Sequence, residues 1–485
     1  MKTLSFFKKS KNGSPKQVKL SSLITATGIG VFMASLDGTI VNISLVKMSQ
    51  ALQVQQYQIQ WVIISYLLTM ITFTAVAGDL GDRYGNKFVF QIGVFVFSLG
   101  SLLCSLSKSL ATLIIFRVVQ GIGGSGTVAN GMAIITRFTT SKNRGTAIGL
   151  NSFIIAIAIT LGPVLGGVLT ETFGWESIFL VNVPLGIIGL IWVQIAIPPT
   201  PPIQETARKA DVIGSITLVL FLTLLVFSIS IVVDPYIPNG KLWFGICLGV
   251  SVIMLLLFLF WEKRIDNPLV DLKLFNRKIA AGVFAAIFAY MGLCVIIYQI
   301  PFFLQDILQL NPIQTGLVIL GAPVGMAIVG AISGRLSDKI DARYISSVSM
   351  VIVLLVQIIL TVFLSQESKA WFFTILAILI GIGLGGFISP NTNSVMSAAP
   401  KEKLGVANGL LSLSTNIGFS LGTALSTLIF AFNRNIFQKI EGSTIDDPNV
   451  YVPAMRWMFL AFALITVIAI TVSYLRGPEE RNEDN

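Results

Sequence analysis

Apolar stretches of about 20 residues recur along the whole chain, and no other feature constrains its fold as strongly. An α-helix rises about 1.5 Å per residue, so a stretch of this length crosses the roughly 30 Å hydrocarbon core of a bilayer. No soluble core needs such regularity. We expect fourteen membrane-spanning helices, near residues 21–46, 58–78, 88–107, 111–136, 146–170, 178–197, 212–233, 242–261, 279–304, 313–333, 345–365, 370–392, 404–432 and 453–475.

Composition and charge agree with an all-α membrane protein. The 485 residues are 54% hydrophobic and 12% charged, whereas soluble domains are about 25% charged. The first apolar run follows a Lys-rich arm and is too long for the h-region of a signal peptide, so we expect no cleavable signal. Most of the 33 Lys and Arg residues fall in segments that are cytoplasmic if the N-terminus is, which predicts that both termini are cytoplasmic.

The same composition argues against several classes of function. The net charge of +10 is scattered over turns, so we expect no nucleic-acid partner. The chain has no histidine, and we expect no metal site, no cofactor and no enzyme activity. Cys104, Cys247 and Cys294 lie far apart within spans, as packing residues do. The glycine-rich runs 121–126 and 381–386 lie inside apolar spans without a preceding strand, so they are not nucleotide loops.

An internal repeat divides the spans into two halves. Residues 78–87 and 334–343 share the pattern Gly-x-Leu-x-Asp-[Arg/Lys]-x-x-x-[Lys/Arg], and each joins the second and third helix of a six-helix half if spans seven and eight are an insert. Such halves are typical of secondary transporters, whose substrate site lies between them. The expected organisation is a basic arm (1–20), a six-helix bundle (21–197), a linker with two extra helices (198–261), a cytoplasmic loop (262–278), a second six-helix bundle (279–475) and a tail (476–485).

Two residues are charged well inside predicted spans, Asp37 and Arg117. A charge at membrane depth is costly, so each should face a partner or a water-filled cavity. Asp37 lies about 22 Å, and Arg117 about 21 Å, from the cytoplasmic side, so the two can pair. One interpretation is that Asp37 binds the coupling proton and a cationic substrate in competition; the other is a fixed ion pair. Arg117 can tune the acid, hold two helices together, or do both.

The candidates for a substrate cavity lie on three spans. On the first span, small and partly polar residues recur on one face at spacings of three and four, although close helix packing gives the same pattern. Aromatic residues can stack on a flat lipophilic cation, although the membrane interface is the favoured place for Trp61. The cavity candidates are Thr27, Gly30, Ala34, Val41, Asn42, Trp61, Tyr66 and Tyr290.

Five motifs resemble those of the major facilitator superfamily and occur in its order. Residues 78–87 resemble motif A, residues 113–126 motif B, and residues 162–167 the antiporter motif C. Residues 33–42 and 175–186 resemble signatures of the fourteen-span drug:proton antiporters, such as QacA-like multidrug exporters. The motif residues are Gly78, Asp82, Arg83, Gly85 and Lys87 in motif A, Gly334, Asp338 and Arg343 in its second copy, and Gly162, Pro163, Gly166 and Gly167 in motif C.

This resemblance implies a fold of two six-helix bundles with two additional central helices. It implies a proton-coupled multidrug exporter in a bacterial cell membrane, working by alternating access on hydrophobic, monovalent cationic compounds; we expect a monomer. Motif C would seal the outer half in one state, unless Pro163 is an ordinary kink. Motif A would latch the outward-open state through Arg83 and Lys87, unless these charges only set topology. Asp341 stands where a glycine would match Gly85, so equal gating roles are not expected.

Other functions stay open at this point. The same fold can export an endogenous lipid, peptide or metabolite. A membrane-embedded enzyme, a channel and a non-transporting scaffold are less favoured. One embedded acid suits monovalent cations, or proton coupling with neutral compounds, whereas a dication would want a second acid, for which Asp306 is the nearest candidate.

Overall fold

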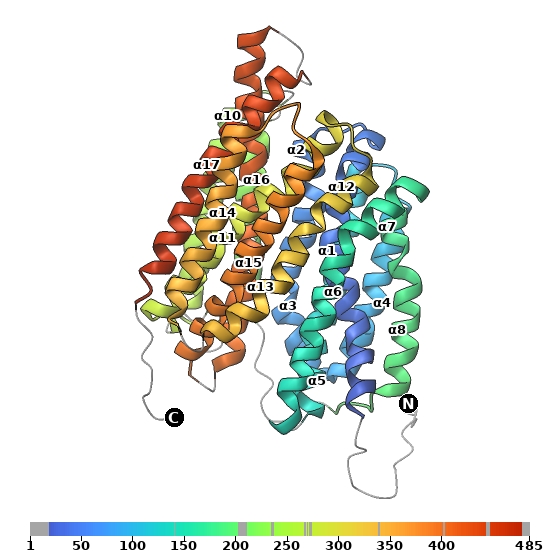
Figure 1. The fold of residues 1–485 in the computed structure, drawn as a ribbon. Coiled ribbons are helices and arrows are strands. Elements are labelled where there is room, and N and C mark those ends of the chain that lie inside the picture. The colour runs from blue at the N-terminus through green and yellow to red at the C-terminus, as the bar shows by residue number, and fades with distance from the viewer. Residues whose placement is uncertain are drawn as a thin grey trace, which may run out of the picture.

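The computed structural model describes most of the chain as helices (Figure 1). Within the described residues there is no strand. The described ranges are 19–139, 141–201, 211–233, 237–265, 268, 270, 274–337, 340–400, 403–442 and 447–477.

Seventeen α-helices and one π-helical turn make up this part of the chain. The first half contains α1 (Leu20–Ala51), α2 (Gln56–Ile59), α3 (Trp61–Tyr84), α4 (Asn86–Ser105), α5 (Leu110–Phe138), α6 (Ser141–Phe173), α7 (Ser177–Leu180) and α8 (Asn182–Ala196). Two further helices follow, α9 (Val212–Val233) and α10 (Gly240–Glu262). The second half contains α11 (Arg277–Phe302), η2 (Phe303–Ile307), α12 (Pro312–Ile319), α13 (Gly321–Ser337), α14 (Ala342–Phe363), α15 (Ala370–Ala398), α16 (Leu404–Glu441) and α17 (Pro448–Tyr474).

Fourteen helical segments in the described residues are long and apolar enough to cross a membrane. Each coincides with one predicted span, so the prediction of fourteen spans is confirmed. Several helices run beyond the predicted ends. The first continues to Ala51, and α16 continues to Glu441, so most of residues 433–452, which lie between the last two predicted spans, are helical.

The two halves pack their helices in the same way. In the first half α1 packs on α6 and α3 on α5, and in the second half α11 packs on α16 and α13 on α15. When the membrane spans of each half are counted in order, the first packs on the fifth and the second on the fourth in both halves. The two bundles stand side by side, one in blue to green and the other in yellow to red (Figure 1). This duplicated packing agrees with the internal repeat in the sequence.

The additional helices cover one of the two seams between the bundles. α9 packs against both α3 and α16, and α10 packs on α9. Trp61 of α3 meets Phe227 of α9 edge-on, with ring centroids 6.2 Å apart. At the other seam, α6 of the first half packs directly on α12 of the second.

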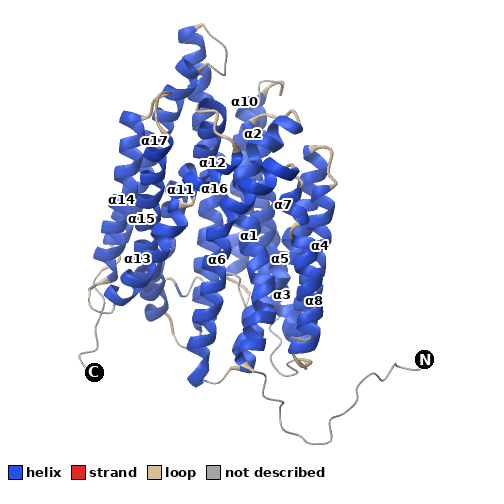
Figure 2. Cartoon of the chain, turned by 45° about the vertical axis from the view of Figure 1, so that its right-hand side comes forward, coloured by secondary structure: helices blue, strands red, loops and turns tan. Residues whose placement is uncertain are grey.

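The halves are joined by hydrogen bonds at one end of the molecule. We call the end where α1 begins and α17 ends the termini face, and the other end the opposite face (Figure 2). At the opposite face the Gln56 amide donates to the Gln299 amide oxygen at 2.6 Å, and the Tyr298 hydroxyl donates to the Gln56 carbonyl at 3.0 Å. The Gln305 amide donates to the Ile43 carbonyl at 3.0 Å. These contacts close the opposite face between the bundles.

The segment expected as a loop at 78–87 is almost wholly helical, which corrects the sequence interpretation. α3 runs to Tyr84, α4 begins at Asn86, and Gly85 alone connects them with a φ of 97°. A side chain at this φ would be strained, and a Cβ would also meet the Thr200 carbonyl. One glycine is enough to reverse the chain here, because the turn needs a single left-handed residue.

Candidate functional site

The two charges predicted inside the spans form an ion pair. The Arg117 Nη1 atom lies 2.6 Å from Asp37 Oδ2, joining α5 to α1. The Asp37 side chain is 0% exposed and that of Arg117 is 1% exposed. At this distance and burial the contact is a charge-assisted hydrogen bond between desolvated partners.

Gln120 completes the pairing of Asp37. Its amide donates to Asp37 Oδ1 at 2.7 Å and to the Ser101 hydroxyl of α4 at 2.8 Å, while its oxygen accepts from Arg117 at 2.6 Å. Both carboxylate oxygens of Asp37 are therefore hydrogen-bonded. Sequence reasoning placed Gln120 in motif B without giving it a role. The available signal was its position three residues after Arg117, which puts the two on one helix face.

Arg117 also contacts α3, the second membrane span. Its Nε atom donates to the Val62 carbonyl of α3 at 2.8 Å, and its guanidinium carbon lies 4.3 Å from the centre of the Tyr66 ring. Phe179 of α7 lies on another side, at 5.7 Å. The guanidinium thus links α1, α3 and α5, and it has polar or aromatic partners in several directions.

A cavity of about 370 Å³ lies between the two halves beside this network. Its wall is formed by α1, α3, α5 and α6 of the first half and by α11, α13, α15 and α16 of the second. Asp37 and Arg117 are the charged residues in the wall, among the described residues. Five predicted cavity residues line it: Ala34, Val41, Asn42, Tyr66 and Tyr290.

Three of the predicted cavity residues lie elsewhere. The Thr27 hydroxyl is buried and donates to the Leu23 carbonyl of its own helix. Gly30 lies where a Cβ would meet Phe90 and Thr127, so it allows α1 to approach α4 and α5 closely. Trp61 packs against Phe227 of α9 at the covered seam. The small-residue face of α1 therefore serves close packing at one end and the cavity at the other.

Sequence reasoning missed most of the second-half wall. Tyr298 of α11 and Thr415, Asn416 and Phe419 of α16 line the cavity. The Tyr290 and Phe419 rings lie 5.3 Å apart at 51°. These residues are uncharged, so no cost of burying a charge marks them in the sequence.

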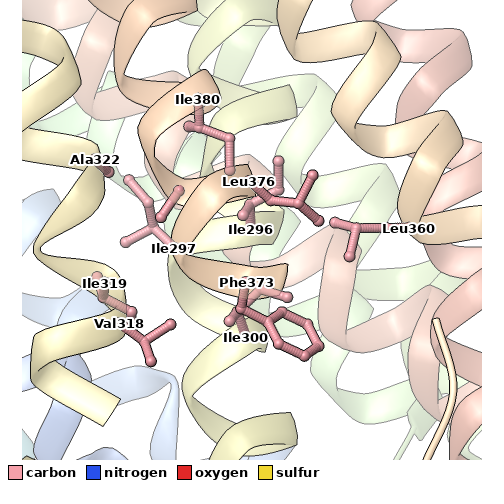
Figure 3. A pocket seen from close by; sticks show the side chains of 11 residues that line it. Ile296, Ile297, Ile300, Val318, Ile319, Ala322, Leu360, Phe373, Leu376 and Ile380 are labelled. Carbon is pink, nitrogen blue, oxygen red and sulfur yellow. The ribbon is translucent and has the colours of Figure 1, made fainter. Parts of the chain in front are cut away.

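Two smaller cavities lie beside the central one. The first, of about 70 Å³, shares Thr39, Asn42 and Met326 with it and reaches Pro163. The second, of about 30 Å³, lies within the second half, where aliphatic side chains and Phe373 face one another (Figure 3). Both are almost wholly apolar, which fits hydrophobic rather than ionic contents.

Motif C lies on α6 at the seam between the halves that α9 and α10 do not cover. A Cβ on Gly162 or Gly166 would meet Thr39 or Ile40 of α1, and a Cβ on Gly167 would meet the Pro312 carbonyl of α12. Conversely, a Cβ on Gly316 of α12 would meet the Pro163 carbonyl. These glycines let α6 contact α1 and α12 backbone to backbone.

The motif A side chains stay within the first half. Arg83 pairs with Asp79, one turn earlier in α3, at 2.7 Å. The Lys87 ammonium donates to the Gln194 and Ile197 carbonyls at the end of α8, at 3.1 and 2.5 Å. The bridge of Arg83 and Lys87 across the cytoplasmic face belongs to the outward-open state and stays a prediction. Gly78 has open space around it, and Asp82 is half-buried in α3.

The second copy of motif A has a different structure. Gly334 lies in α13, near Ser389 of α15. Asp341 caps α14 by accepting from the Arg343 amide, and the two side chains are 3.4 Å apart. Asp338 lies outside the described residues. Asp306, the nearest candidate for a second acid, is exposed at the opposite face and does not line the cavity.

Comparison with known proteins places this geometry in a family. The model of the Major Facilitator Superfamily matches residues 27–265 and 282–485. The riboflavin transporter RibZ of Clostridioides difficile (strain 630) is 32% identical over 458 residues, covering 93% of this chain and 97% of RibZ. The multidrug resistance protein Stp of Mycobacterium tuberculosis (strain CDC 1551 / Oshkosh) is 32% identical over 425 residues, covering 86% of this chain and 76% of Stp.

The fold has a solved counterpart. The crystal structure of a bacterial homolog of the human lysosomal transporter Spinster, in an inward-facing and occupied conformation, superposes with a TM-score of 0.68 at 15% identity. The alignment covers 96% of this chain and 97% of that one. At this identity the likeness establishes the fold alone.

Proposed function

Since the chain belongs to the Major Facilitator Superfamily, we propose that it is a proton-coupled exporter of hydrophobic compounds. It is a membrane transporter by family, and export, proton coupling and substrate are the proposal. Substrate binds in the cavity between the halves, which open alternately to the two sides of the membrane. The chain works as a monomer in a bacterial cell membrane with both termini in the cytoplasm.

The observation that carries the proposal is the buried pair of Asp37 and Arg117 in the cavity wall. Asp37 is the acid that lines the cavity among the described residues, and both its oxygens are hydrogen-bonded. Protonation of Asp37 removes the charge that Arg117 pairs with, and loss of the proton restores the pair. A proton therefore changes the contact between α1 and α5, the helices that carry this wall of the cavity.

The hydrogen bonds at the opposite face support an inward-facing state. With the termini in the cytoplasm, the Gln56–Gln299 contact closes the outer side. The glycine contacts of motif C lie at the same end, where Gly167 meets Pro312. In this state both Asp37 oxygens are paired with Arg117 and Gln120, so in the proposed cycle the proton leaves before or as substrate enters from the cytoplasm.

A named relative favours export over import, and so does the resemblance of residues 162–167 to the antiporter motif C. Stp is named a multidrug resistance protein, which is consistent with efflux by a related chain. One embedded acid suits monovalent cations or proton coupling with neutral compounds, so the sequence leaves the charge of the substrate open. Since a cation reaches the Asp37 oxygens only after Arg117 and Gln120 release them, the proposal rests on proton coupling and a hydrophobic cavity, not on substrate charge.

A second candidate is transport of a heteroaromatic metabolite. It is favoured by one observation, the 32% identity to the riboflavin transporter RibZ over 97% of that protein. The two candidates share the fold and the cavity and differ in substrate.

Everted membrane vesicles test the proposal. An acid interior drives uptake, and ethidium and riboflavin serve as a cationic and a neutral probe in separate runs. We expect uptake of at least one probe that collapses when a protonophore dissipates the gradient. Vesicles without the protein are the control. Uptake of neither probe, or uptake that survives collapse of the gradient, would contradict proton-coupled export of such compounds.

A further inference from the structure

Resting on the proposed function, we infer that the cavity between the halves selects flat, electrically neutral heteroaromatic compounds with hydrogen-bonding edges over lipophilic cations. Three observations support this inference: the charges of the wall, the position of its aromatic rings and an unpaired amide.

The wall of the cavity carries no uncompensated charge. Among the described residues it holds Asp37 and Arg117, whose charges cancel. Both oxygens of Asp37 already accept hydrogen bonds, and its side chain is 0% exposed. A cationic ligand would leave water without finding a free counter-ion, which is the costly case of a buried charge. A neutral ligand avoids this cost.

The aromatic ring nearest the acid is already occupied by a cation. Arg117 lies over the Tyr66 ring, 4.3 Å from its centre. A ring face attracts a cation because of its negative quadrupole, and here that attraction is used inside the protein. A second cation beside Tyr66 would be repelled by the guanidinium. The first-half wall therefore favours an uncharged partner.

Aromatic rings of the second half suit a flat ligand. Tyr290 of α11 and Phe419 of α16 lie together in the wall, with centroids 5.3 Å apart. Offset and edge-on contacts between rings stabilise a flat aromatic system at such a surface. The cavity volume of about 370 Å³ falls within the range of about 300–1,000 Å³ that small-molecule sites occupy.

A polar group in the wall is available to the edge of such a ligand. The half-buried Asn416 amide lines the cavity and makes no hydrogen bond to any described residue. A ligand that offers an acceptor or donor at its edge would pair with this amide. The Tyr66 ring also lines the cavity, but its hydroxyl is buried within the first half, near Gly124 of α5.

The test compares two probes of the same shape and different charge. Acridone is neutral and carries a carbonyl and an N–H on its edges, while 10-methylacridinium is a fused three-ring cation. Binding of each to the purified full-length protein in nanodiscs is followed by fluorescence. We expect acridone to bind about tenfold more tightly or better. Equal or tighter binding of 10-methylacridinium would overturn the inference.

One variant locates the contact. Asn416→Ala removes the amide and should weaken acridone binding about three- to tenfold, with a smaller effect on the binding of 10-methylacridinium. Cys247→Ala, on α10 away from the cavity, is the matched control. Unaltered acridone binding in Asn416→Ala would also overturn the inference.

Failure of this inference can be distinguished from failure of the proposed function. Gradient-driven uptake together with a preference for 10-methylacridinium would leave proton-coupled export standing and reject the neutral substrate class. Absence of gradient-driven uptake for every probe would reject the proposed function itself. The probe comparison uses the unaltered protein, so it does not depend on the folding of any variant.

Discussion

The Arg117 guanidinium and the Asp37 carboxylate lie 2.6 Å apart, with side chains that are 1% and 0% exposed. The pair joins α5 to α1 within the first half, and the Gln120 amide donates a hydrogen bond to the other carboxylate oxygen. Because each charge is desolvated, neither can lose its partner without a large cost. The pair therefore stabilises the contact between α1 and α5, and protonation of Asp37 would break it.

Removing the arginine should destabilise the protein strongly. We expect Arg117→Ala to lower the free energy of unfolding by about 3–5 kcal/mol, because the Asp37 charge is left buried and unpaired. Thermal unfolding in detergent measures the change. Asp37→Asn in the Arg117→Ala background should recover part of the loss, since the orphaned charge is removed. No recovery would show that the two residues act independently.

The partly exposed pair Arg83–Asp79 gives a contrast. It also has a short distance, 2.7 Å, but Arg83 is 39% exposed and Asp79 is 10% exposed. We expect Arg83→Ala to cost about 1 kcal/mol or less, because solvent reaches the guanidinium and screens the pair. The same unfolding assay compares it with Arg117→Ala. Losses of similar size would contradict the role given to burial.

The glycines of motif C should control closure of the opposite face. In Gly167→Val the new side chain would meet the Pro312 backbone of α12, so α6 and α12 must separate. We expect greater accessibility of a cysteine placed at Gln299 to a membrane-impermeant thiol reagent added from the opposite face. Gly149→Val is the control, because Gly149 lies on the same helix with open space around it. Equal labelling in the two variants would rule out a sealing role.

Lys87 should act by stabilising the end of α8. Its ammonium donates to two carbonyls there, at Gln194 and Ile197. A cation at a helix C-terminus satisfies unpaired carbonyls and the helix dipole. We expect Lys87→Met to cost about 1.5–3 kcal/mol of stability, the range for hydrogen bonds to charged groups. Lys108→Met, an exposed lysine, should be neutral in the same assay. A normal stability for Lys87→Met would contradict the capping role.

The spans and the ion pair could be predicted from the sequence because their physical cost is visible there. A membrane-crossing helix needs a long apolar run, and each run shows in the sequence. A charge at membrane depth is rare, so Asp37 and Arg117 stood out, and their estimated depths allowed the pairing that the structure forms.

The rest of the site depends on tertiary packing. Asn416 and Phe419 reach the cavity because α16 crosses α11 at a particular rotation, which no local pattern in the sequence specifies. Gly85 was predicted within a loop, because Gly, Asp and Arg near it resemble a turn. In the structure Gly85 alone makes the turn and α3 continues to Tyr84.

The most direct test of the central claim separates uphill from downhill transport in Asp37→Asn. Proteoliposomes carry the wild type or the variant, with a transported probe from the vesicle assay. If Asp37 carries the coupling proton, the variant should keep exchange of the probe across the membrane without a pH gradient and lose accumulation driven by one. Accumulation equal to that of the wild type would contradict the account, because the proton would then bind elsewhere.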